Sequence, residues 1–130
     1  MRQKINDKYK SAAEEFARRV TAALGEGVDS IVLFGSVARG EAKRDSDVDV
    51  LVVSPDPRAV RSAVSEICGD FTYERDYTFL ISLVHFSGEE LHHLRQLGSP
   101  FIGEVIAQGV VLYDNGTFAR VCREAVSASR

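Results

Sequence analysis

The sequence predicts a domain of the α/β (α+β) class, built as a mixed β-sheet of about four strands with helices packed mainly on one face. Two patterns support this prediction. Short apolar runs rich in Val, Ile and Phe are typical of buried strands. Longer segments with apolar residues three or four positions apart are typical of helices. In chain order the segments follow each other as α-β-β-α-β-α-α-β-α.

The first half of the chain supplies the first helix, two strands and a second helix. Apolar residues recur at helical spacing over residues 4–24. "SIVLF" (30–34) and "DVDVLVV" (47–53) follow as the first two strands. Asp56 can cap a helix that begins at Pro57, and Gly69-Asp70 is expected to end it.

The second half begins with a short extended piece around residues 71–73, and it continues with the third strand, "YTFLISLVHF" (77–86). Ser87 and Glu90 form the pattern of a capping box for a helix that runs to about Leu97. The remaining expected elements are a helix from Pro100 to Gly109, a short edge strand "VVLY" (110–113), a turn at Asp114-Asn115-Gly116 and a last helix.

The composition describes one folded domain over residues 1–130. Hydrophobic residues make up 45% of the chain and charged residues 27%, which excludes a disordered protein. The chain has no apolar run long enough to span a membrane and opens with no secretory leader, so we expect a cytoplasmic protein that does not associate with membranes. The net charge of −3 argues against an extended nucleic-acid surface. Cys68 and Cys122 are expected to be reduced core residues.

Two carboxylates, Asp47 and Asp49, lie in the second predicted strand. Because side chains alternate along a strand, both point to the same side, roughly 7 Å apart. Like charges placed in this way repel each other, and a divalent cation such as Mg²⁺ would resolve the conflict. The alternative is that residues 46–49 form a solvated loop before the strand.

A predicted phosphate-binding turn lies upstream of the carboxylates. Gly35 and Ser36 directly follow the first strand, where a glycine lets a phosphate approach the backbone and a hydroxyl can donate to it. Arg39, Lys43 and Arg44 add positive charge for a polyphosphate. An isolated Gly-Ser pair is more often an ordinary turn. The combination of turn, basic connector and paired acids is what favours a nucleotide site.

The stretch "FGSVARGEAKRDSDVDVLVV" (34–53) resembles the minimal nucleotidyltransferases of the DNA polymerase β-like superfamily. Their pattern is an apolar residue, Gly-Ser, a spacer of about ten residues and then Asp-x-Asp between apolar positions. The later stretch "SPFIGEVIAQGVVLYD" (99–114) is also similar to the end of these small domains, although it is less specific. The resemblance covers residues 28–114.

The resemblance implies a nucleotidyltransferase fold and transfer of a nucleoside monophosphate from a nucleoside triphosphate, ATP being the expected one, to an acceptor hydroxyl with release of pyrophosphate. Asp47 and Asp49 would be the catalytic metal ligands and hold two Mg²⁺ ions. The Gly35–Ser36 turn would hold the β and γ phosphates. A HEPN-type helical partner protein, or a homo-oligomer, is the expected assembly.

The sequence departs from the family at the third strand, where active members carry a third carboxylate. Ser82 occupies the expected position, and the nearest acids are Glu74 and Asp76. Three alternatives follow. The chain is an active enzyme whose third ligand comes from Asp76, Glu74, a water or a partner; or it binds nucleotide without turnover, as a sensor or an antitoxin-like partner; or it is a scaffold for assembly.

Overall fold

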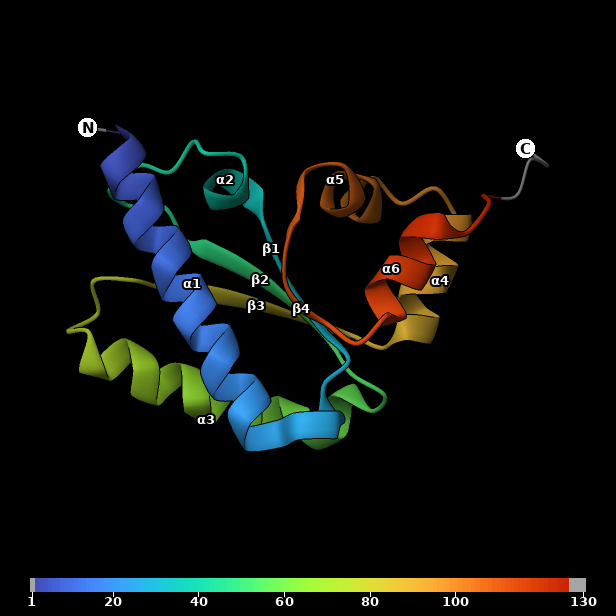
Figure 1. Cartoon of the computed structure of the whole chain (residues 1–130), viewed down its shortest axis with the longest axis horizontal. Helices are drawn as coiled ribbons and strands as arrows, with labels where there is room; N and C mark the ends of the chain where they lie inside the picture. Colours follow the sequence, from blue (N-terminus) through green and yellow to red (C-terminus); the bar gives the residue numbers. More distant parts are fainter. Residues whose placement is uncertain (1, 127–130) are drawn as a thin grey trace.

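A four-stranded β-sheet lies at the centre of the protein, with its strands in the spatial order β3-β2-β1-β4 (Figure 1). The computed structural model describes residues 2–126. The strands are β1 (Ser30–Phe34), β2 (Val48–Val53), β3 (Ile81–Phe86) and β4 (Val110–Asp114). The helices are α1 (Arg2–Leu24), the 3-10 turn η1 (Gly25–Gly27), α2 (Gly35–Ala38), α3 (Pro57–Glu74), α4 (Gly88–Gln96), α5 (Pro100–Gln108) and α6 (Thr117–Arg123).

The sheet is mixed, as the sequence predicts. β1 is antiparallel to both β2 and β4, whereas β2 and β3 are parallel. The parallel pair needs a crossover connection, and α3 supplies it. The predicted fold class and order of elements are therefore confirmed, with the short helices η1 and α2 added.

Helices cover both faces of the sheet, so the expectation that they pack mainly on one face is wrong (Figure 1). On one face, α1 and α3 pack Phe16 and Phe71 against Val50. On the other face, α5 packs Ile102 against a cluster that includes Leu51. The reason is visible in β2, where residues 50–53 are all fully buried. A strand that is apolar on both sides needs a cover on both sides.

Helix α3 is longer than predicted, because it continues through Gly69-Asp70 to Glu74 and leaves no extended piece at residues 71–73. A Cβ at Gly69 would meet no atom within 4 Å, so this glycine lies on an open face of the helix and does not terminate it. The helix continues because the fully buried Phe71 anchors its last turns in the core, with its ring centroid 6.0 Å from that of Phe16.

Strand β3 is shorter than predicted and begins at Ile81 instead of Tyr77. Asp76 and Tyr77 have φ angles of 54° and 58°, in the left-handed region that no strand residue occupies. Phe79 then turns into the core and makes an edge contact with the ring of Tyr9, at 5.2 Å between centroids. Tyr77 therefore lies in a turn outside the sheet.

Several predicted helix ends are confirmed. The Asp56 side chain caps α3 by accepting from the amide of Ala59, and Ser87 and Glu90 form a reciprocal capping box at α4. Cys68 and Cys122 are free, partly buried thiols packed against different core clusters. Within residues 2–126, the helices are too short or too polar to cross a membrane.

Candidate active site

Asp49 lies near the start of β2, between the two neighbouring strands. Its register partner on β1 is Phe34, and its partner on β3 is Ser82. Asp47 is exposed and directly precedes the strand. The interior of the sheet thus fixes the position of Asp49, while Asp47 belongs to the end of the connecting loop.

The backbone of Gly35 packs directly against the Asp49 carboxylate. Gly35 has a φ of +78°, and a Cβ at this position would overlap the Oδ2 atom of Asp49. Glycine is therefore required here for two reasons: the left-handed backbone and the close carboxylate. The sequence predicts the glycine for approach to a phosphate, whereas the neighbour that the structure places against it is the carboxylate of Asp49.

The surroundings of Asp49 disfavour its ionised form. Burial, the charge of Asp47 and the charge of Glu104 all raise the pKa of Asp49, and Arg39 lowers it in part. Within residues 2–126, no side chain or backbone group donates a hydrogen bond to the Asp49 carboxylate. A half-buried carboxylate that lacks hydrogen-bond donors has oxygens available to a divalent cation, because Mg²⁺ takes such oxygens as ligands.

Arg39 is already engaged with two carboxylates. Its Nε atom lies 3.0 Å from Glu41 Oε1, and its Nη1 atom lies 3.0 Å from Glu104 Oε2. Glu104 comes from α5, which covers this face of the sheet, and it is a site residue that the sequence analysis missed. No sequence pattern indicates it, because 65 positions separate it from Arg39.

The remaining predicted phosphate ligands lie on α2 and the loop after it. Ser36 is half-buried in α2. Lys43 and Arg44 are exposed, and Arg44 lines a hollow of about 190 Å³ together with Asp47. The structure thus brings Arg39 and Arg44 near the acids and leaves the Lys43 side chain in solvent.

Two residues of α1 anchor this loop. The Asn6 side-chain amide is buried, donates to the Val37 carbonyl at 3.1 Å and accepts from the Ala42 amide at 3.0 Å. The Tyr9 hydroxyl donates to the carbonyl of Arg44. The sequence analysis assigned no such role to Asn6, although a polar residue on the apolar face of a helix is the signal that would have indicated one.

The structure places the three residues considered for the missing third acid in different regions. Ser82 is adjacent to Asp49, at the predicted position. Glu74 is bound by the Arg19 guanidinium, with its two oxygens 2.7 and 3.1 Å away, on the α1–α3 face. Asp76 lines a surface hollow with Lys8. Among residues 2–126, no three His, Cys, Asp or Glu side chains are arranged to hold a metal ion.

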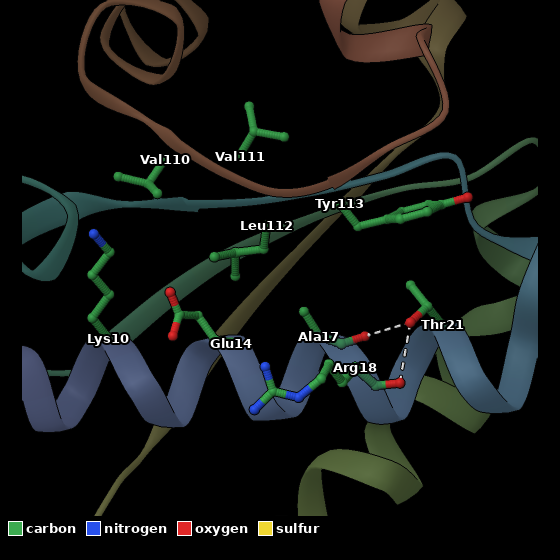
Figure 2. A pocket seen from close by; sticks show the side chains of 9 residues that line it. All are labelled: Lys10, Glu14, Ala17, Arg18, Thr21, Val110, Val111, Leu112 and Tyr113. Carbon is green, nitrogen blue, oxygen red and sulfur yellow. Dashed lines mark hydrogen bonds between the residues drawn. The ribbon is translucent and has the colours of Figure 1, made fainter.

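A groove between α1 and the outer edge of β4 is the clearest alternative site (Figure 2). Its walls carry Lys10, Glu14 and Arg18 on one side and the apolar side chains of β4 on the other. A single carboxylate between two cations offers no metal pair. The region of Asp47 and Asp49, with its paired carboxylates, therefore remains the candidate active site.

Comparison with known proteins shows the family of this chain. Residues 10–96 match the family described as "Nucleotidyltransferase domain". The chain is also similar to two proteins of Methanocaldococcus jannaschii that bear the provisional name protein adenylyltransferase. One is 30% identical over 97 residues, which cover 75% of this chain and 91% of the relative. The other is 29% identical over 105 residues, which cover 81% and 71%.

Two solved structures share the fold. A toxin–antitoxin crystal structure with AMP-PNP superposes with a TM-score of 0.54 at 19% identity, covering 83% of this chain and 82% of that one. A mutant of the toxin–antitoxin pair MntA–HpeT superposes with a TM-score of 0.56 at 18% identity, covering 84% and 80%. Identities this low are evidence for the fold alone.

Proposed function

This chain belongs to the nucleotidyltransferase domain family, and from that premise we propose that it transfers AMP from ATP to a hydroxyl group on a partner protein. Nucleotidyl transfer follows from the family. The protein acceptor is supported by the two Methanocaldococcus relatives, whose names describe protein adenylylation.

The observation that carries the proposal is the state of Asp49. A carboxylate with a raised pKa, no hydrogen-bond donor among residues 2–126 and a glycine backbone pressed against it has no structural task in the fold. Asp47 and Asp49 would hold Mg²⁺, which would supply neutralisation of the charge that develops on the phosphate oxygens.

The residues around the acids have separable tasks. Gly35 and Ser36 receive the β and γ phosphates beside the end of β1. Lys43 and Arg44 provide positive charge from the connecting loop. Arg39 reaches the triphosphate by exchanging its contacts with Glu41 and Glu104 for contacts with phosphate. The loop thus supplies phosphate binding and the first carboxylate, Asp47, and β2 supplies the second, Asp49.

In the transfer step, the acceptor oxygen forms a bond to the α-phosphorus of ATP while the bond from that phosphorus to the bridging oxygen breaks. Pyrophosphate leaves with the electron pair, and the proton of the acceptor hydroxyl passes to water. Most of the rate comes from holding the two oxygens in line and neutralising charge. Ser82 cannot take the proton as a carboxylate would, because a serine hydroxyl is not a base at neutral pH.

The serine at position 82 also favours a second candidate function. A chain that binds ATP but lacks a base beside the metal pair could act as a nucleotide-dependent partner of another protein, without turnover. The two toxin–antitoxin structures share this fold, so an antitoxin-like role with a helical HEPN-type protein, or assembly with a second copy, belongs to this candidate.

Calorimetry with ATP and Mg²⁺ tests the nucleotide site. Asp49→Asn should abolish Mg²⁺-dependent ATP binding, because it removes a ligand charge. Asp70→Asn, an exposed acid on α3, serves as the matched control and should bind like the parent. Equal binding by both variants would contradict the assignment of Asp49.

Ser82→Asp decides between the enzyme and the nucleotide-dependent partner. A positioned base typically contributes a factor of about 10² to 10⁴ in rate. Pyrophosphate release in the presence of an acceptor should therefore rise by a large factor in Ser82→Asp if the site is built for transfer. A parent protein that binds ATP and a variant that remains inert would favour the partner function.

A further inference from the structure

We propose that Tyr77 of this chain is itself an acceptor, so that the protein attaches a nucleotidyl group to its own Tyr77 hydroxyl. The proposal rests on the proposed function and deepens it, because it names an acceptor on the protein. It begins from the turn that follows α3. Asp76 and Tyr77 adopt left-handed backbone angles there while their amides cap the end of the helix, donating to the carbonyls of Tyr73 and Thr72, so the backbone of Tyr77 has a fixed place beside the start of β3.

The direction of the reaction selects the side from which an acceptor approaches. In-line displacement requires the attacking oxygen to lie opposite the leaving pyrophosphate. Gly35 and Ser36 follow β1, Asp47 directly precedes β2 and Asp49 lies in it, and β3 lies on the far side of β2. With pyrophosphate leaving over the β1 side, the acceptor enters from the β3 side, at the turn that contains Tyr77.

Tyr77 borders the loop that carries Asp47, one of the two proposed metal ligands. It lines the same hollow of about 190 Å³ as Asp47, together with Leu80. Its side chain is open to solvent, because Tyr77 is 64% exposed and Leu80 is 57% exposed. The Tyr77 ring makes an edge contact with Tyr73, at 6.3 Å between centroids. A solvent-accessible phenol therefore lies at the side from which we expect the acceptor to enter.

The chemistry of a phenol suits a site that lacks a base. The Tyr77 oxygen bonds to the α-phosphorus of ATP, the bond to the bridging oxygen breaks, pyrophosphate leaves and the phenolic proton passes to water. Phenols release a proton far more readily than aliphatic alcohols, so they depend less on the carboxylate that Ser82 replaces. The neighbouring Thr78 hydroxyl donates to the Arg75 carbonyl at 2.7 Å and is already engaged.

Intact-mass measurement after incubation with ATP and Mg²⁺ tests the proposal. The parent should gain the mass of one AMP, located on Tyr77 by peptide mapping, and Asp49→Asn should gain none. Tyr77→Phe should lose the label but still bind ATP in calorimetry, because the ring remains. Tyr73→Phe is the matched control: its tyrosine is equally exposed, at 70%, and the variant should stay labelled.

The outcomes separate this inference from the proposed function. A parent that binds ATP and Mg²⁺ through Asp49 but remains unlabelled, also in the Ser82→Asp background, overturns the acceptor role and leaves the proposed function standing. A label that persists in Tyr77→Phe, or a Tyr77→Phe variant that no longer binds ATP, also contradicts it. A parent that binds no nucleotide overturns the proposed function and the inference with it.

Discussion

An aspartate of a neighbouring strand lies beside each end of β1, and the pKa values of the two aspartates are shifted in opposite directions. At one end, Asp114 of β4 is the register partner of Ser30; at the other, Asp49 of β2 is the register partner of Phe34. Both carboxylates are partly buried. The pKa of Asp114 is lowered, because hydrogen bonds from Ser30 and from three backbone amides outweigh its burial. The pKa of Asp49 is raised, first of all by burial.

The difference lies in the donors that surround each carboxylate. The Asp114 side chain accepts from the Ser30 hydroxyl at 2.8 Å and from the amides of Gly116, Phe118 and Ala119, each at 3.0 or 3.1 Å. These bonds tie β4 to the start of α6. The fold thus uses one aspartate as a structural part and leaves the other without hydrogen-bond donors, and this contrast supports the proposal that Asp49 is kept for a ligand.

Replacing each aspartate by alanine should give the largest contrast. Asp114→Ala leaves the buried Ser30 hydroxyl and the amides at the start of α6 without their acceptor, and it should lower the free energy of unfolding by about 3 kcal/mol. Asp49→Ala in metal-free buffer should cost far less, because no hydrogen bond is lost. Urea denaturation of both variants measures the contrast. Equal losses would show that Asp49 is also a structural carboxylate.

A comparison of two glycines of the motif tests whether the contact between Gly35 and the Asp49 carboxylate matters. Gly35 and Gly40 both have positive φ angles, but a Cβ would overlap Asp49 only at Gly35, and at Gly40 it would meet nothing within 4 Å. Each change to alanine should cost about 1–2 kcal/mol for the left-handed backbone. Gly35→Ala should cost more and also weaken ATP–Mg²⁺ binding. Thermal unfolding and calorimetry measure both effects. Equal stability and equal ATP binding of the two variants would contradict a role for the contact between Gly35 and Asp49.

The smallest effect is the pH dependence, and it has opposite signs for the two aspartates. The lowered pKa of Asp114 means that its stabilisation is present above the ordinary carboxyl pKa and is lost as the pH falls through its folded-state pKa. The raised pKa of Asp49 means that its ionised form destabilises the metal-free protein, and that this penalty disappears as the pH falls through its folded-state pKa.

Denaturation of the parent, Asp114→Asn and Asp49→Asn across the acid range measures both signs. At neutral pH the parent should be more stable to unfolding than Asp114→Asn and less stable than Asp49→Asn. Both differences in the free energy of unfolding should shrink as the pH falls. Added Mg²⁺ should remove the deficit of the parent relative to Asp49→Asn at neutral pH. A parent more stable than Asp49→Asn without metal would contradict the description of Asp49 as unsatisfied.

Local chemistry made much of the fold predictable from the sequence. The capping box at Ser87 and Glu90, the Asp56 cap and the apolar runs of β1 and β2 each involve neighbours in the chain, and the structure has all of them. The predictions that failed depend on distant contacts. For example, the burial of Phe71 in the core stabilises the last turns of α3, so the helix continues beyond Gly69, where it was expected to end.

The same division applies to the site. The motif brings Gly35 and Asp49 together through the pairing of β1 with β2, which a strand-loop-strand pattern predicts. The contact of Glu104 with Arg39 and the role of Asn6 under the loop depend on helices elsewhere in the chain. Asp114 appears in the sequence as an ordinary turn residue, because its hydrogen bond to Ser30 spans 84 positions.

The burial of β2 on both faces has a thermodynamic consequence for ligand binding. Asp49 projects from a strand whose other side chains are all fully buried, so a cation bound by the proposed site would meet a ligand that is already immobile. Lys43 and Arg44 lie on a connector without regular structure, and ordering them around a triphosphate costs conformational entropy. The contribution of Asp49 to metal affinity should thus be an intrinsic property of the rigid sheet, whereas the contributions of the loop residues can be tuned by any contact that orders their side chains in advance.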